Sequence, residues 1–117
     1  MFDLKKAQRI FIAVGYTDLR QGIDGFVTLV QNTFHMNPQT STLFLFCGRR
    51  SDRIKALFWD GDGYLLLYKR LEDGRYQWPR TETELKELTF QQFRWLMEGL
   101  NIYQKKVIRP VEKQLTY

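Results

Sequence analysis

The stretch from Leu43 to Pro79 constrains the fold more than any other part of the chain. It holds three short apolar runs, rich in aromatic and branched residues and ended by glycine or a polar residue. Such runs are typical of β-strands. Between the second and third runs, Asp60-Gly61-Asp62-Gly63 supplies residues that tolerate the backbone angles of a tight hairpin turn. The stretch predicts an antiparallel meander with strands at 42–47, 54–59 and 64–71.

The register of the hairpin across that turn follows from the turn itself. If Gly61 and Asp62 are its central residues, Asp60 lies opposite Gly63, and side chains that face each other share one face of the sheet. The predicted facing pairs are Trp59 with Tyr64, Leu57 with Leu66, Lys55 with Tyr68, and Arg53 with Arg70. One face then combines basic and aromatic side chains, and the other is mostly aliphatic and suited to a core.

The flanking segments complete an α+β pattern. A β-branched run ended by glycine at 9–15 predicts a first strand. Apolar residues recur at helical spacing over 23–34 and again over 90–97. The predicted order is β-α-β-β-β-α, an antiparallel sheet of about four strands with the helices packed on one face. We expect a single α+β domain over residues 1–100 and a basic C-terminal tail at 101–117.

Composition narrows the class of protein. The formal net charge of +5 favours a polyanionic partner such as nucleic acid. Cys47 is the one cysteine, so an internal disulfide is excluded. His35 is the one histidine, and these two residues are too few to form a zinc site. No apolar run approaches the roughly 20 residues of a membrane helix. We therefore expect a cytoplasmic protein with no membrane anchor, metal centre or cofactor.

Catalytic patterns are weak along the chain. A nuclease would need two or three acids around a metal ion, and Asp60 with Asp62 are the nearest pair. Their place between two strands favours turn formation. His35 has no partner at the spacing of a catalytic triad and is interpreted as a surface or loop residue. We expect no catalytic residues, and a metal nuclease at Asp60 and Asp62 stays as the least favoured hypothesis.

Basic and aromatic residues around the meander are the stronger signal. Guanidinium groups fit phosphate bidentately, and aromatic rings can stack on unpaired bases or anchor a protein partner. The candidate nucleic-acid-binding residues are Arg49, Arg50, Arg53, Lys55, Lys69 and Arg70. The candidate interaction residues are Trp59, Tyr64, Tyr68 and Trp78. The alternative is a solvated face with local ion pairs, such as Arg53 with Asp52.

Several blocks of the sequence, in this order, resemble one known family. The blocks are Thr17–Gly25, Phe46–Lys55, Trp59–Gly63, Tyr68–Glu72, Gly74, Trp78–Pro79 and Leu88–Gly99. The family is the small second-reading-frame protein of the insertion-sequence-66 transposons of bacteria, also called transposase B of that family. It is distinct from the RNA-guided nuclease of similar name. The chain departs from the family at Gln21, where a lysine is often found.

The resemblance implies a partner role in transposition, beside a separate, larger transposase that carries the acidic catalytic residues. We therefore expect a non-catalytic accessory protein that binds the DNA of transposon ends through the basic and aromatic face of the sheet. The alternative is a protein-interaction module that docks on the transposase.

Overall fold

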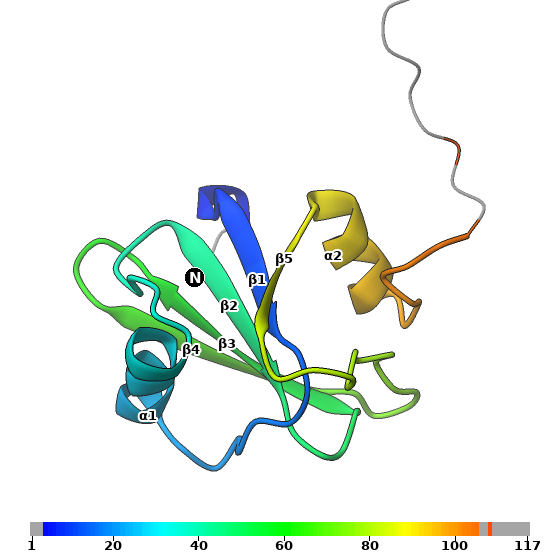
Figure 1. Ribbon diagram of the computed structural model, residues 1–117, viewed down its shortest axis with the longest axis horizontal. Helices are drawn as coiled ribbons and strands as arrows, with labels where there is room; N and C mark the ends of the chain where they lie inside the picture. Colours follow the sequence, from blue (N-terminus) through cyan, green and yellow to red (C-terminus); the bar gives the residue numbers. More distant parts are fainter. Residues whose placement is uncertain (1–3, 106–107, 109–117) are drawn as a thin grey trace, which may run out of the picture.

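A mixed five-stranded β-sheet forms the centre of the fold (Figure 1). The computed structural model describes residues 4–105 and residue 108. The elements in chain order are η1 (Leu4–Lys6), β1 (Arg9–Ala13), α1 (Ile23–Thr28), the π-helical turn η2 (Leu29–Thr33), β2 (Thr42–Cys47), β3 (Arg53–Trp59), β4 (Tyr64–Arg70), β5 (Leu85–Leu88) and α2 (Phe90–Met97). The strands lie side by side in the order β4-β3-β2-β1-β5.

The predicted hairpin is confirmed, including its register. β3 and β4 pair antiparallel, with Arg53 opposite Arg70 and Trp59 opposite Tyr64. The Asp60 N–H donates to the Gly63 carbonyl at 2.8 Å and closes the turn. Gly61 has a φ of +85°, which is the left-handed conformation that glycine adopts at low cost.

The rest of the sheet differs from the predicted one. β1 and β2 are parallel, with Ile10 opposite Leu43. The connection through α1 and η2 returns the chain to the end of the sheet where β1 begins, so β2 runs in the same direction. A fifth strand, β5, pairs antiparallel with β1. Its sequence, Leu-Lys-Glu-Leu, is too short and too charged to show a strand pattern. The sheet is therefore mixed and five-stranded, and not antiparallel and four-stranded.

The helices pack on opposite faces of the sheet, so the prediction of a single covered face was wrong (Figure 1). Phe26 of α1 packs against Phe46 of β2, with ring centroids 4.6 Å apart. Phe93 and Leu96 of α2 belong to the cluster on the other face, with Ile12 of β1. All six residues of β2 are buried. A strand that is apolar on both sides needs a cover on both sides. α1 contributes to the cover of one face, and α2 together with Tyr76, Trp78 and Ile102 contributes to the cover of the other.

The second helix begins and ends as its sequence predicts. The Thr89 hydroxyl accepts from the Gln92 N–H, and the Gln92 side chain accepts from the Thr89 N–H, which is a capping box. Ile102, beyond the helix, is 1% exposed and joins the core. Most of the predicted tail at 101–117 lies outside the described residues. Within the described range, no helix is both long and apolar enough to cross a membrane.

Candidate nucleic-acid interface

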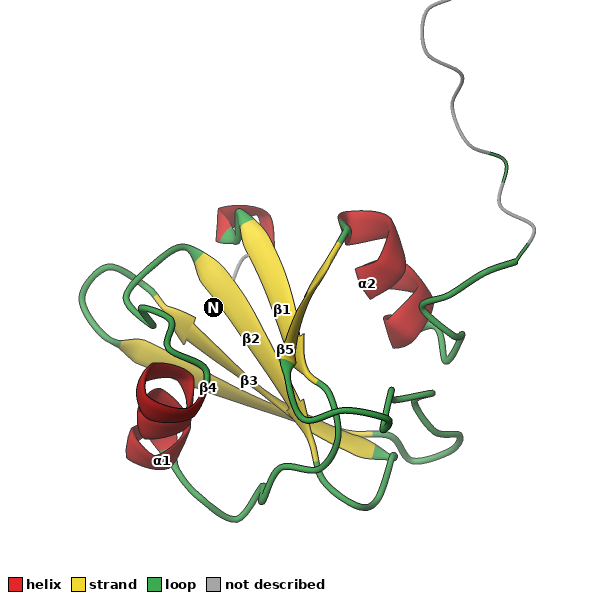
Figure 2. Ribbon diagram, in the orientation of Figure 1, coloured by secondary structure: helices red, strands yellow, loops and turns green. Residues whose placement is uncertain are grey.

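The loops that follow β1 and β2 leave the sheet at the same end (Figure 2). A cleft of about 410 Å³ lies between these loops. Because β1 and β2 are parallel, their carboxyl ends lie at the same end of the sheet, and open sheets commonly bind ligands beyond the carboxyl ends of parallel strands. The Thr17 N–H donates to the Cys47 carbonyl at 2.9 Å and holds the two loops together. Gly15 starts the first loop at a φ of +90°, and a Cβ there would lie 3.1 Å from the Glu82 carbonyl oxygen. The topology thus creates the cleft.

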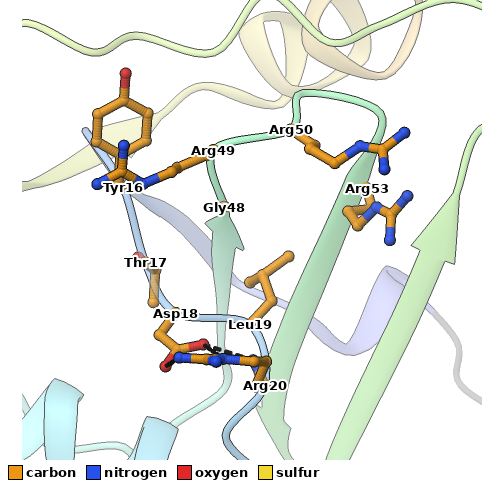
Figure 3. Close-up of a pocket in the computed structure, with 9 residues that line it drawn as sticks. All are labelled: Tyr16, Thr17, Asp18, Leu19, Arg20, Gly48, Arg49, Arg50 and Arg53. Atoms are coloured by element: carbon orange, nitrogen blue, oxygen red, sulfur yellow. Dashed lines mark hydrogen bonds and ion pairs between the residues drawn. The ribbon is translucent and has the colours of Figure 1, made fainter.

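We call this the arginine cleft, after the side chains that line it (Figure 3). Its lining residues are Tyr16, Thr17, Asp18, Leu19, Arg20, Gly48, Arg49, Arg50 and Arg53. Four of these are arginines and one is an acid.

One wall of the cleft carries Arg49, Arg50 and Arg53, from the β2–β3 turn and the start of β3. Arg49 and Arg50 are exposed, whereas the Arg53 side chain is 28% exposed. Asp52 accepts from Arg53 at 3.0 Å and lies 3.7 Å from a guanidinium nitrogen of Arg50. The hydrogen bond from Arg53 is the main cause of the lowered pKa of Asp52. The Asp52 carboxylate pairs with the guanidinium groups of both Arg50 and Arg53, and Arg49 adds a third positive charge. This wall therefore has a net positive charge.

The facing loop holds an ion pair between Asp18 and Arg20. The Arg20 side chain donates to both carboxylate oxygens of Asp18 at 3.0 Å. These hydrogen bonds, followed by one from the Arg20 backbone N–H, lower the pKa of Asp18 to about 2. Asp18 is therefore an anion at neutral pH, and its charge is balanced by Arg20. The positive charge of the cleft then comes from the three arginines of the other wall.

Tyr16 and Arg80 form a contact that the sequence did not predict. The Tyr16 ring is 60% exposed at the mouth of the cleft. The Arg80 guanidinium carbon lies 4.4 Å from the ring centroid, and that of Arg49 lies 5.3 Å away. Arg80 comes from the loop after β4, so no spacing in the sequence relates it to Tyr16. The one signal was its place directly after Trp78-Pro79, a block that resembles the family.

The six predicted nucleic-acid-binding residues do not form one surface. Arg53 and Arg70 share a face, as expected from the register. Lys55 is on that face but half-buried beneath α1, with its Nζ 3.4 Å from the Gln21 carbonyl oxygen. Lys69 pairs with Ile54 and therefore points to the opposite face. The structure brings Arg49, Arg50 and Arg53 together in one cleft and leaves the two lysines apart from it.

The four predicted interaction residues are also dispersed. Trp59 and Tyr64 pack on each other, with ring centroids 4.9 Å apart, at the end of the hairpin remote from the cleft. Tyr68 is 54% exposed on the edge strand β4. Trp78 is buried in the core, where its Nε1 donates to the Ala13 carbonyl at 2.9 Å. Its position excludes it from a surface patch.

Asp60 and Cys47, the acidic and thiol groups considered for chemistry, both have structural contacts. Asp60 lies 3.4 Å from the Lys6 ammonium group. Across the part of the chain that the structure describes, no three His, Cys, Asp or Glu side chains gather as metal ligands. Cys47 is a buried free thiol, and burial raises its pKa, so it is kept protonated.

The fold and the cleft together define a small basic α+β protein with an arginine-lined opening at one end of its sheet. Residues 8–107 match the family described as IS66 Orf2 like protein, and the chain belongs to that family. The family resemblance of the sequence motifs is thereby confirmed. Membership associates the chain with insertion-sequence transposition.

Two proteins of Sinorhizobium fredii (strain NBRC 101917 / NGR234) are similar to the chain. The uncharacterized protein y4hO is 36% identical over 93 residues, which is 80% of this chain and 81% of that protein. The uncharacterized protein y4jC is 30% identical over 115 residues, which is 96% of this chain and 98% of that protein. No solved structure matches the chain significantly.

Proposed function

We propose that this protein is a non-catalytic accessory factor of insertion-sequence transposition, and that its arginine cleft binds the phosphates of transposon-end DNA. Family membership supports the role in transposition. The observation that supports DNA binding is the gathering of four arginines and one acid around one open cleft. Guanidinium groups bind phosphate with two parallel hydrogen bonds. The protein acts in the bacterial cytoplasm, where it works beside the larger transposase.

The structure changes which residues we expect to carry DNA binding. Arg49, Arg50 and Arg53 stay as the primary phosphate contacts because they line one cleft. Arg70 extends the same face along β4, where it lies opposite Arg53. Lys55 and Lys69 contribute less, since one is half-buried under α1 and the other points to the far face.

A charge-reversal experiment tests this function. Fluorescence anisotropy would measure the affinity for a labelled duplex with the element's end sequence, compared with a scrambled duplex. We expect Arg49→Glu with Arg50→Glu to abolish binding. The control is Arg94→Glu with Lys105→Glu, which makes the same change in net charge at exposed positions on and after α2. Equal affinity of the two double variants would contradict the proposal.

A salt titration separates phosphate contacts from indirect effects. Each neutralised phosphate contributes about 0.9 to the slope of log affinity against log salt. We expect Arg49→Gln with Arg50→Gln to lower that slope by about two. Weaker binding with an unchanged slope would show that these side chains do not touch phosphate.

A second candidate function is docking on the transposase through β4. This strand is at the edge of the sheet, and its Leu67 and Tyr68 side chains are 36% and 54% exposed. An exposed strand edge can pair with a strand of another protein. Co-purification with the transposase, lost in Tyr68→Ala and kept in Tyr103→Ala, would support docking there. A complex that survives Tyr68→Ala would contradict it.

A further inference from the structure

We propose that Tyr16 stacks on an unpaired base while the arginine cleft beside it holds the phosphate of that nucleotide, so that the protein prefers single-stranded DNA to duplex. This inference rests on the proposed DNA-binding function and specifies which state of the DNA the cleft recognises. It assigns a role to Tyr16 and Arg80.

The position of Tyr16 is suited to contact with a ligand. Its ring is 60% exposed and belongs to neither core cluster of the described residues. It lines the cleft together with Arg49 and Arg50 (Figure 3). One nucleotide at this place would meet both an aromatic ring and guanidinium groups.

Arg80 fixes the ring before any ligand arrives. Its guanidinium group donates to the Gly15 carbonyl at 2.8 Å and to the Gly48 carbonyl at 2.7 Å, and it reaches Ser51 Oγ at 3.2 Å. This anchored cation lies 4.4 Å from the Tyr16 ring centroid. A cation over an aromatic ring attracts it, so the ring is held in place and loses little freedom when a base stacks on it.

Arg49 is the adaptable partner in this arrangement. Its guanidinium carbon lies 5.3 Å from the Tyr16 ring centroid. Within the range that the structure describes, its exposed side chain makes no ion pair or hydrogen bond that would hold it. Arg49 can therefore move from the ring to a phosphate when a base takes its place.

The chemistry favours an unpaired nucleotide. In a duplex the faces of the bases are covered by their neighbours, so an aromatic side chain has nothing to stack on. In a single strand every base offers a face, and aromatic stacking tolerates any sequence. The cleft volume of about 410 Å³ is in the range of small-ligand pockets, which suits one nucleotide at a time.

The test compares strands of one sequence. A single-stranded oligonucleotide with 2-aminopurine at one position, and its duplex, would be titrated with the full chain at fixed salt. We expect tighter binding of the single strand and quenching of 2-aminopurine by stacking. Tyr16→Leu should weaken single-strand binding about tenfold, with duplex affinity and salt slope unchanged, because a stacking contact and no charge is lost. Tyr16→Phe, which keeps the ring, should bind like the parent protein.

Three results would count against the inference, and they can be told apart. If Tyr16→Leu binds both DNAs like the parent, Tyr16 only covers Arg80, and DNA binding itself stands. If the parent protein binds single strands without quenching 2-aminopurine, stacking is excluded without any variant. If the parent protein binds neither DNA, the proposed function fails as well. Circular dichroism and a thermal unfolding midpoint would confirm that Tyr16→Leu is folded.

Discussion

At the scale of single residues, Arg80 organises the candidate site although it does not line the cleft. It hydrogen-bonds to backbone carbonyls of two separate loops, at Gly15 and Gly48, and it packs on Tyr16. These loops follow β1 and β2, so one side chain from the loop after β4 ties the ends of two strands together. An arginine can do this because its guanidinium group has several donors in a fixed plane.

The first prediction concerns this role. Arg80→Met should lower the free energy of unfolding by about 2 kcal/mol, because the Gly15 and Gly48 carbonyls lose their charged donor. Arg49→Met, at an exposed position, should change it by less than about 0.5 kcal/mol. Urea denaturation followed by circular dichroism measures both. Equal stability of Arg80→Met and the parent protein would refute the structural role of Arg80.

The second prediction concerns pH. The pKa of Asp18 is depressed to about 2 by its hydrogen bonds with Arg20. A depressed pKa means that the ion pair stabilises the fold above the usual pKa of an aspartate and loses that effect as the pH falls toward 2. NMR titration of the Asp18 carboxyl carbon should show a midpoint near 2. In Arg20→Gln the midpoint should rise toward the ordinary value, and an unmoved midpoint would show that Arg20 is not the cause.

At the scale of elements, the β3–β4 hairpin is the most locally determined part of the fold. Its strands and its turn are consecutive in the sequence, and the turn alone fixes which residues face each other. Gly61 is in the left-handed region with a φ of +85°, while Gly63 is not. A Cβ added at either glycine would meet no heavy atom within 4 Å. The two glycines thus differ in backbone conformation and not in available space.

The third prediction follows from that difference. Gly61→Ala should lower the free energy of unfolding by about 1 kcal/mol, because an L-residue is strained at that φ. Gly63→Ala should leave it within about 0.5 kcal/mol of the parent value. Guanidinium chloride denaturation of the two variants provides the measurement. A larger loss for Gly63→Ala than for Gly61→Ala would be inconsistent with a turn that has its left-handed residue at Gly61.

At the scale of the whole molecule, the sheet is the layer that two separate apolar clusters share. Leu45 belongs to the cluster on the α2 face and Leu57 to the cluster on the α1 face. They come from the adjacent strands β2 and β3. Because both clusters are built on the same strands, we expect them to unfold together.

The fourth prediction tests this cooperativity. Leu45→Ala and Leu57→Ala should each lower the free energy of unfolding by about 3 kcal/mol, since each leaves a cavity in a packed core. Tryptophan fluorescence and circular dichroism should give the same midpoint in both variants, as for a two-state transition. A separate transition at lower denaturant or temperature in Leu57→Ala would show that the cluster on the α1 face unfolds independently of the cluster on the α2 face.

The amino-acid sequence by itself determined the meander, the register of its hairpin and the second helix. The physical reason is that each of these depends on residues close together in the chain: a turn sets a register, and a cap starts a helix. The composition and the arginines next to the meander also indicated a polyanionic partner.

Only the tertiary structure decided the parallel pairing of β1 with β2, the fifth strand and the opposite placement of the two helices. It also buried Trp78, placed Lys55 beneath α1 and brought Arg80 to Tyr16. These outcomes depend on contacts between segments far apart in the chain, and local patterns of apolar and polar residues do not encode them. The cleft exists because two strands run in the same direction, and that direction was set by the path of the chain through α1.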